Sequence, residues 1–163
     1  MRVSVSADEL VGVARVIVEE LRRRGHEPVA HGALTEEERN DWAWASEAAA
    51  RDVAEGRADQ GIVCCWTGTG ASIAANKVSG VRAALCLDAD SAAGERLPQL
   101  PVEAGGADLL GARKWNDANV LALSLRGTSD AELDEILNAW FEAQPSADRQ
   151  DRANVDHLSE IEA

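Results

Sequence analysis

The sequence predicts an α/β protein of three layers, in which a doubly wound, five-stranded parallel sheet lies between two layers of helices. Three observations lead to this fold class. Short β-rich segments alternate with helical segments five times along the chain, an order that is typical of parallel sheets. Residues 61–66 form a continuous apolar run, as expected of a strand covered on both faces. Glycines stand where expected helices end, at Gly25, Gly56 and Gly80.

The expected strands are short and rich in apolar and β-branched residues. They cover residues 2–7, 27–30, 61–66, 81–86 and 119–123. Helices are expected where apolar residues recur at helical spacing. They cover the stretch from Leu10 to Gly25, residues 42–55, 71–78 and 91–97, and the segment that begins at the capping box of Ser129 and Glu132 and ends at Pro145. Residues 31–41 and 98–111 are expected to be loops or irregular.

The length of 163 residues suits one domain, here residues 1–145, followed by an acidic tail, residues 146–163, with one more expected helix. Sixteen Lys and Arg against 29 Asp and Glu give a net charge of −13. Such a charge disfavours nucleic acids and acidic membrane surfaces as partners, although a few local cations still suffice for a small anion. No apolar run approaches the roughly 20 residues of a membrane span, and residues 1–7 lack a signal peptide's apolar core. We therefore expect a soluble, cytoplasmic protein.

The three cysteines, Cys64, Cys65 and Cys86, form no CxxC motif and no cluster with histidines. A structural zinc site is therefore not expected. Neighbouring residues of a strand point to opposite faces, so Cys64 and Cys65 should not pair with each other. This usage fits a reducing compartment.

Ligands of doubly wound sheets bind beyond the carboxyl ends of the strands, near the point where the strand order reverses. Four features stand just past an expected strand: Asp8, the segment Cys65–Gly70, Asp88 and Arg126. They are the first candidates for a site.

The segment from Cys65 to Ser72 has two glycines, Gly68 and Gly70, at a strand-to-helix turn. Its amides can form an anion-binding nest next to a helix N-terminus. The segment is not a Walker loop, because no Gly-Lys-Ser/Thr follows, and Ile73 stands at the third glycine position of the dinucleotide fingerprint. The alternative is a tight turn without function.

Cys65 ends its strand beside this nest, where oriented amides favour a thiolate that serves as nucleophile or base. The alternative is a small, inert core residue, an interpretation that suits Cys64. Three cations are candidates for binding a phosphate, or else lie on solvated surfaces: Arg126, Arg149 and Arg152. The histidines show no metal-ligand spacing and are expected at the surface: His26, His31 and His157. Trp42 and Trp44, near a helix start, suit either packing or a ligand wall.

Residues 61–84, with the run Ser-Ile-Ala-Ala-Asn-Lys at 72–77, resemble the signature of the ribose-5-phosphate isomerase B and galactose-6-phosphate isomerase family. Residues 116–123 resemble the second motif of that family, and the likeness extends in order over nearly the whole chain. The resemblance implies a Rossmann-like fold and an aldose–ketose isomerase of sugar phosphates that needs no metal or cofactor. It also implies a homodimer, or a tetramer, with sites built from both subunits, to which the tail would contribute.

By position, Cys65 resembles the family's thiol base, which moves a proton between C1 and C2 of the sugar. Thr67 and the amides from Gly68 through Thr69 to Gly70 resemble the cradle for the enediolate oxygens, and Asn116 resembles a side-chain donor to them. Asp8 resembles a residue that holds substrate hydroxyls. The resemblance places the phosphate at Arg126, Arg149 and Arg152, with the last two shifted by a residue.

Three residues depart from the family pattern. Glu9 stands where the family has a phosphate-binding histidine, Trp115 replaces the histidine credited with opening the sugar ring, and Trp66 replaces a glycine of the cradle. Residues 97–114 are also longer than their counterpart. The resemblance thus implies an isomerase of the ribose 5-phosphate type. The alternatives are an isomerase of a tetrose phosphate or an unphosphorylated sugar, or a binding protein for sugar phosphates that has lost catalysis.

Overall fold

The computed structural model describes residues 1–87 and 111–163. Three expectations therefore lie outside the described residues: the helix at 91–97, the irregular segment up to residue 110, and Asp88 as a site residue. So does most of the longer segment 97–114.

A five-stranded parallel sheet forms the centre of the protein, with the strand order β2-β1-β3-β5-β4. Its strands are β1 (Arg2–Ala7), β2 (Glu27–Gly32), β3 (Gln60–Cys65), β4 (Ala83–Leu85) and β5 (Val120–Ser124). After β2 the chain returns to the other side of β1 and forms β3, so the strand order reverses between β1 and β3. The predicted doubly wound sheet is confirmed.

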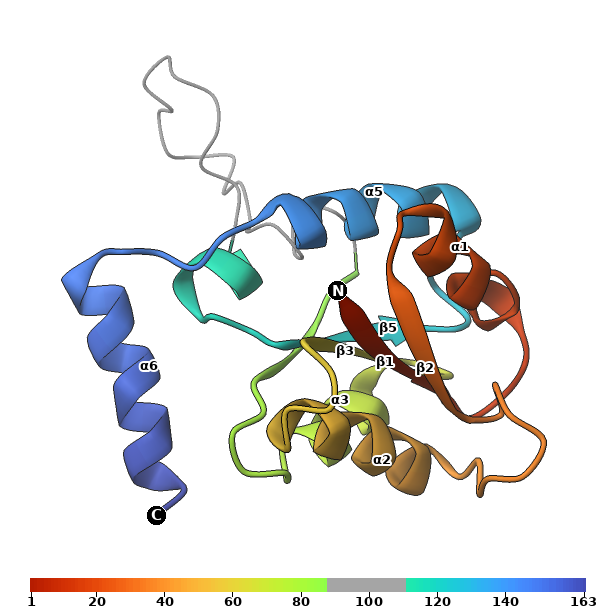
Figure 1. Ribbon diagram of the computed structural model, residues 1–163, viewed down its shortest axis with the longest axis horizontal. Coiled ribbons are helices and arrows are strands. Elements are labelled where there is room, and N and C mark those ends of the chain that lie inside the picture. The colour runs from red at the N-terminus through yellow and green to blue at the C-terminus, as the bar shows by residue number, and fades with distance from the viewer. Residues whose placement is uncertain (88–110) are drawn as a thin grey trace.

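Helices cover both faces of the sheet (Figure 1). On one face lie α1 (Ile17–Arg23) and α5 (Asp130–Glu142), and on the other lie α2 (Trp42–Ala54) and α3 (Thr69–Ala75). Each face has its own core. Leu21 and Trp140 contribute to the core under α1 and α5, whereas alanines such as Ala49 and Ala71 let α2 and α3 pack closely on the other face.

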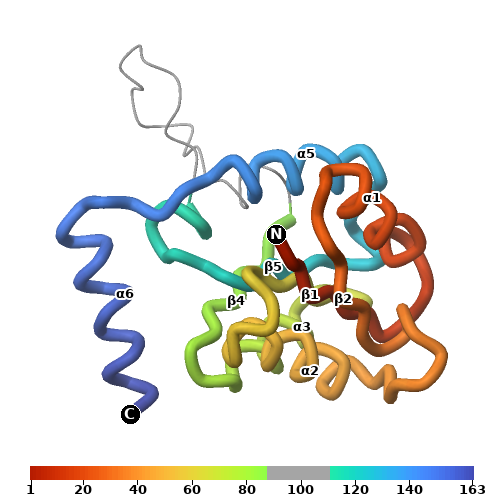
Figure 2. Tube along the Cα trace, in the orientation of Figure 1, coloured from red at the N-terminus to blue at the C-terminus, as the bar shows by residue number. Residues whose placement is uncertain are grey.

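The predicted capping box is present at the start of α5. Ser129 Oγ accepts a hydrogen bond from the backbone N–H of Glu132, and the Glu132 carboxylate accepts one from the backbone N–H of Ser129. Helix α6 (Arg149–Ile161) confirms the helix expected in the tail. It extends beside the sheet domain and has no buried residue (Figure 2).

The first expected helix is interrupted, which corrects the prediction from its apolar periodicity. A 3-10 turn, Gly12–Arg15, precedes α1, and Leu10 is exposed rather than in the core. Gly12 has φ +51°, and a Cβ there would lie 2.3 Å from the carbonyl oxygen of Leu125. A positive φ lies outside the right-handed helical region, so a regular helix cannot continue through Gly12.

Other boundaries also differ from the prediction. Strand β4 covers only Ala83–Leu85 of the expected residues 81–86, and most of the remaining elements differ by a residue or more. Helix α3 covers Thr69–Ala75 rather than residues 71–78, and the side chain of Asn76, which follows it, bonds to the backbone of β4. Its Nδ2 donates to the carbonyl of Ala83 and its Oδ1 accepts from the N–H of Ala83, both at 2.8 Å. Strand β2 continues to Gly32, two residues into the expected loop.

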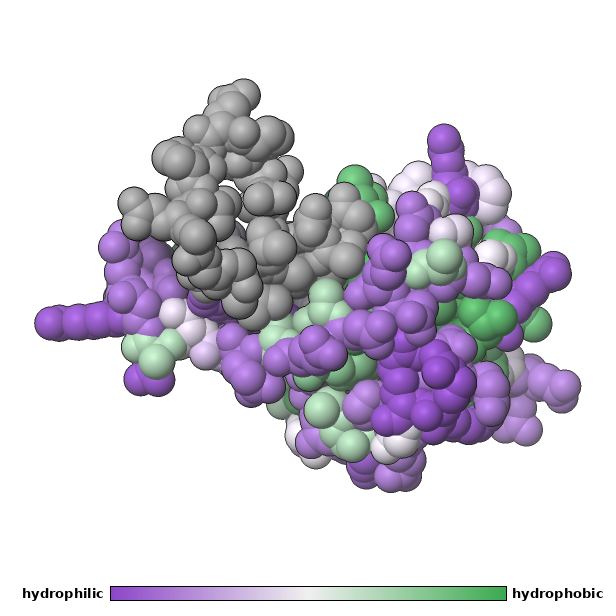
Figure 3. All heavy atoms as spheres, turned by 90° about the horizontal axis from the view of Figure 1, so that it is seen from above, coloured by the Kyte–Doolittle hydropathy of each residue, from purple (hydrophilic) through white to green (hydrophobic). Residues whose placement is uncertain are grey.

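Hydrophilic residues dominate the face seen from above, over α1 and α5, with apolar patches between them (Figure 3). Within residues 1–87 and 111–163, every helix is too short or too polar to cross a membrane.

Candidate functional site

The sheet brings three of the four features expected past its strands to one edge. Ala7 is in register with Cys64 on the neighbouring strand, so Asp8 follows level with Cys65. Cys65 is in register with Ser124 on the other side, two residues before Arg126. Adjacent strands lie about 4.8 Å apart, so these residues form a compact cluster at the point where the strand order reverses.

Cys65 and Cys64 have different environments, as their alternation predicts. The Cys64 side chain lies in the core under α1 and α5, where burial above all, and then the charges of Cys65 and Asp8, raise the pKa of its thiol. The Cys65 side chain lies on the other face, and its Sγ accepts a hydrogen bond from the backbone N–H of Ala71 at 3.4 Å. This bond fixes the sulfur beside the first turn of α3. Of these two thiols, Cys65 is the one that lies on the face of α3 and the loop after β3, and it stays the candidate for chemistry.

The loop after Cys65 depends on Gly68, which adopts the left-handed conformation with φ +76°. Its N–H donates to the carbonyl oxygen of Cys65 at 3.1 Å and closes a tight turn. A Cβ on Gly68 would lie 2.4 Å from Leu85 Cδ1 and 3.0 Å from the carbonyl of Leu123. Only glycine fits there, while Thr67 and Thr69 on either side are exposed. The loop thus presents backbone and hydroxyl groups to a ligand.

Strand β5 holds the other side of this loop. The carbonyl oxygen of Trp66 accepts hydrogen bonds from Ser124 Oγ at 3.0 Å and from the N–H of Arg126 at 3.2 Å. These bonds fix the backbone of Arg126 beside Trp66. The Trp66 indole is half exposed, as is the side chain of Ile73 on α3. Trp66 therefore adds an apolar wall at the rim of the loop.

Asp8 has a carboxylate suited to a hydroxyl ligand. Its Oδ1 is buried and accepts no hydrogen bond from the described part of the chain. Burial raises the pKa of the Asp8 carboxyl above its usual value, and the charge of Glu9 adds to the rise, while backbone amides, including that of Trp66, oppose it. A buried acceptor without a donor is costly, so a substrate O–H that donates to Asp8 would be favoured.

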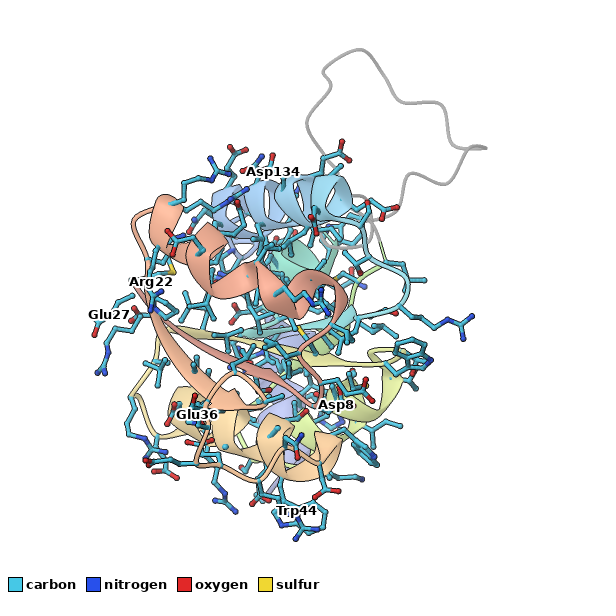
Figure 4. The ribbon with its side chains drawn as sticks, turned by 90° about the vertical axis from the view of Figure 1, so that its right-hand side faces the viewer. Asp8, Arg22, Glu27, Glu36, Trp44 and Asp134 are labelled. Atoms are coloured by element: carbon cyan, nitrogen blue, oxygen red, sulfur yellow. The ribbon has the colours of Figure 1, made fainter. Side chains whose placement is uncertain are left out.

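The loop after β2 extends the site into an acidic cavity of about 590 Å³. Four carboxylates line it: Asp8, Glu9, Glu36 and Glu38. In Figure 4, Asp8 lies at the end of β1 and Glu36 on the loop after β2, while Asp134 lies across the sheet on α5. This charge repels a phosphate and suits hydroxyl groups, which donate hydrogen bonds to carboxylates.

The remaining candidates lie at the opposite edge of the sheet. Trp115 and Asn116 precede β5, whereas Cys65 lies level with the end of that strand, about 13 Å away along β5 alone. Trp115 and Arg152 line a cavity of about 430 Å³ next to α6, and Arg149 begins that helix. Within one chain the structure does not bring these residues to Cys65. The order along the chain already contained this signal, because residues before a parallel strand lie at its amino end.

The two tryptophans at the start of α2, Trp42 and Trp44, have different surroundings. The Trp42 ring packs on Gly70, where a Cβ would lie 3.0 Å from it, so this indole forms a wall beside the loop. The Trp44 ring is covered by the guanidinium of Arg39 and lies far from Asp8 in Figure 4.

The expected surface position of His31 is wrong: its side chain is only 14% exposed and bonds to the buried Asp52.

His26 is also less exposed than expected, because its ring packs on Phe141 with the ring centroids 4.2 Å apart. His157 is exposed, as predicted. Sequence reasoning gave no role to the loop residues Glu38 and Asn40, which border the acidic cavity.

Activity is expected to survive prolonged treatment with EDTA. Among residues 1–87 and 111–163, no three His, Cys, Asp or Glu side chains come together as metal ligands do. Turnover before and after dialysis against the chelator measures this. A loss that added Mg²⁺, Mn²⁺ or Zn²⁺ restores would contradict the prediction.

Residues 3–99 match the family described as Ribose/Galactose Isomerase. Ribose-5-phosphate isomerase B of Escherichia coli K12 is 36% identical over 146 residues, which cover 90% of this chain and 85% of the relative. D-erythrulose-4-phosphate isomerase of Pectobacterium atrosepticum is 38% identical over 95 residues, which cover 58% of this chain and 51% of that relative. The structure of ribose-5-phosphate isomerase B from Mycoplasma genitalium with bound ribulose-5-phosphate superimposes with a TM-score of 0.78 and 26% sequence identity. The match covers 99% of this chain and 95% of that structure's chain.

Proposed function

Because this chain belongs to the ribose/galactose isomerase family, we propose that it interconverts an aldose phosphate and a ketose phosphate, as in the conversion of ribose 5-phosphate to ribulose 5-phosphate. The observation that carries the proposal is the placement of Cys65. Its sulfur lies at the carboxyl edge of the sheet, bonded to the N–H of Ala71, and Cys65 is level with Asp8, whose Oδ1 has no hydrogen-bond partner in the described residues. A base and a hydroxyl-binding group thus lie side by side.

The proposed reaction moves one proton between neighbouring carbons. The Cys65 thiolate removes the proton from C2 of the open-chain aldose, and the electron pair moves toward O1 to give an enediolate. The same thiol returns that proton to C1, while the proton on O2 is transferred to O1, so that a ketone forms at C2. Fixed amides between Thr67 and Gly70, with the Thr67 hydroxyl, stabilise the charge on the oxygens. The step needs no oxidant, metal or cofactor.

The phosphate has to lie away from the acidic cavity. Carboxylates at Asp8 and Glu9 repel it, so the hydroxyl groups of the sugar occupy that side and the phosphate points toward Arg126. One exposed arginine is a weak phosphate site. Further cations have to come from elsewhere in the assembly.

We propose that a second copy supplies them. In a homodimer, or a tetramer built from such dimers, the amino edge of one subunit would face the carboxyl edge of the other. Asn116 would then reach the enediolate oxygens, and Arg149 and Arg152 would bind the phosphate. The arrangement is supported by the half-exposed Trp66 and Ile73 at one edge and by α6, which has no buried residue, at the other. A cytoplasmic location suits such an enzyme and stays a prediction.

The experiment that tests the function is a coupled assay on a panel of sugars. The panel contains ribose 5-phosphate, erythrose 4-phosphate, galactose 6-phosphate and the corresponding free sugars. We expect turnover of at least one phosphorylated sugar and none of its free form. Binding without turnover would support the alternative of an inactive sugar-phosphate-binding protein, and turnover of free sugars alone would contradict a phosphate site.

An open-chain four-carbon sugar phosphate is expected to have a higher kcat/KM than ribose 5-phosphate. A furanose must first lose its ring, and that proton transfer needs a placed acid–base group. The indole of Trp115 stands where the family has a histidine, and it cannot supply one. The similarity to D-erythrulose-4-phosphate isomerase supports a four-carbon substrate as the second candidate.

The substitution Trp115→His tests this reasoning. It should raise kcat/KM for ribose 5-phosphate more than for erythrose 4-phosphate, when both substrates are measured on both proteins. A wild-type preference for ribose 5-phosphate, together with no selective gain from the histidine, would contradict it.

A further inference from the structure

A polar cluster lies between β1, β2 and α2, on the face of the sheet away from α1 and α5. Asp52 is 6% exposed and accepts hydrogen bonds from Ser4 Oγ at 2.9 Å, Arg57 Nε at 2.7 Å and His31 Nε2 at 2.7 Å. Burial alone would raise the pKa of the Asp52 carboxyl, but these hydrogen bonds outweigh it and lower the pKa. Asp52 is thus an ionised carboxylate at neutral pH, and His31 is one of its three partners.

The other ring nitrogen of His31 also faces a carboxylate. Nδ1 lies 3.0 Å from Glu38 Oε2 and 3.2 Å from Glu38 Oε1. Glu38 Oε2 in addition accepts the N–H of Gly32 at 3.2 Å. His31 therefore joins the buried Asp52 of α2 to Glu38, which is part of the loop after β2.

This loop borders the proposed substrate site. Asn40 Nδ2 donates to the carbonyl oxygen of Asp8 at 3.1 Å, and the N–H of Ala33 donates to the carbonyl oxygen of Ala7 at 2.8 Å. Glu38 and Asn40 also line the acidic cavity beside Asp8. A change in the hydrogen bond between His31 and Glu38 therefore alters the position of this loop, which borders the side of the site where sugar hydroxyls are proposed to bind.

Both partners of His31 are hydrogen-bond acceptors, so the ring needs two N–H groups to bond to both of them. A neutral imidazole has one N–H, whereas the protonated ring has two and can donate to both carboxylates. The charged groups around the ring are Asp52 on α2, Glu38 on the loop and, behind Asp52, Arg57. When the ring loses a proton, one nitrogen lone pair faces a carboxylate. The exposed partner, Glu38, is the one free to move away.

We propose that His31 is a positioning residue. In its protonated form it donates hydrogen bonds to both Asp52 and Glu38, and this pair of bonds, called the clasp below, holds residues 33–40 beside Asp8 and so favours substrate binding. Deprotonation of His31 loosens this loop. The inference rests on the proposed function, because it assumes that sugar hydroxyls bind at Asp8. His31 does not contact the reacting carbons, so the clasp acts on KM and leaves kcat unchanged. Loss of the proton changes the number of N–H groups on the ring, so the effect is measured as a dependence of KM on pH.

The test compares Glu38→Gln with Glu37→Gln, a matched control that removes the neighbouring exposed carboxylate, which does not line the cavity. KM and kcat are measured from pH 5.5 to 8.5 with the preferred substrate of the panel. We expect KM of the wild type and of Glu37→Gln to rise about fivefold more over this range than KM of Glu38→Gln. Ionisation of the substrate phosphate affects all three proteins equally and cancels in the comparison. His31→Lys, a cation at every pH in this range, should keep KM low throughout.

A second measurement does not depend on activity. Hydrogen–deuterium exchange of residues 33–40, corrected for the intrinsic effect of pH, should be faster at pH 8 than at pH 6 in the wild type and equal at both in Glu38→Gln. If no sugar is isomerised, the proposed function fails, and the exchange data alone decide whether the clasp exists. The same pH dependence of exchange or of KM in Glu38→Gln as in Glu37→Gln would overturn the clasp.

Discussion

Replacement of Cys65 by alanine is expected to lower kcat by about 10²–10⁴-fold, the usual contribution of a positioned general base. The thiol lies at the end of β3, beside Asp8, and its sulfur is bonded to the N–H of Ala71. No other group of the loop after β3 has a comparable basicity, since Thr67 and Thr69 carry only hydroxyls. Steady-state kinetics with the preferred sugar phosphate measure the loss, and the circular dichroism spectrum should stay that of the wild type.

Cys64→Ala is the matched control, because it removes the same atom one residue earlier in the strand. The Cys64 side chain is 1% exposed and lies in the other core, so its loss leaves a small cavity. We expect a destabilisation of about 1 kcal/mol, visible as a lower Tm, with kcat nearly unchanged. If Cys65→Ala retained wild-type turnover, or if Cys64→Ala lost it, the thiol mechanism would be wrong.

Two inactive variants are expected to regain activity when they form a mixed dimer with each other. One carries Cys65→Ala, and the other carries Arg149→Glu and Arg152→Glu, which reverses the charge proposed to bind the phosphate. If each site combines Cys65 of one subunit with the arginines of its partner, the mixed dimer has one intact site. Its activity should then be about half that of the wild type, because one of two sites works.

The control places all three substitutions in one chain and pairs it with a wild-type chain. A shared site predicts that this dimer is inactive, because each of its two sites then contains a substitution. A site within one chain predicts the reverse: half activity here and none for the first pair. Two different affinity tags allow each mixed dimer to be purified before the assay. The two pairs thus give opposite results under the two arrangements.

Much of the fold follows from local patterns in the chain. The alternation of strands and helices gave the parallel sheet, and the capping box at Ser129 marked the start of α5. The period of two in β3 also assigned Cys64 and Cys65 to opposite cores. These features depend on residues a few positions apart, so one sequence is enough to predict them.

The predictions that failed depend on residues far apart in the chain. The first helix is interrupted at Gly12, which has a positive φ and lies close to the carbonyl of Leu125, and no periodicity near Gly12 reveals that contact. His31 is not at the surface because Asp52, on α2, accepts its hydrogen bond from inside the protein.

By itself the sequence predicted the candidates for the chemistry: a thiol at a strand end, a glycine loop after it, a carboxylate after β1 and a few arginines. Only the tertiary structure decided which of these meet. Parallel strands bring Asp8, Cys65 and Arg126 to one edge of the sheet and leave Trp115, Asn116 and Arg152 at the other. Local sequence sets the type of each element through short-range sterics and hydrogen bonds, whereas a site is set by strand order and direction, which depend on packing across the whole chain.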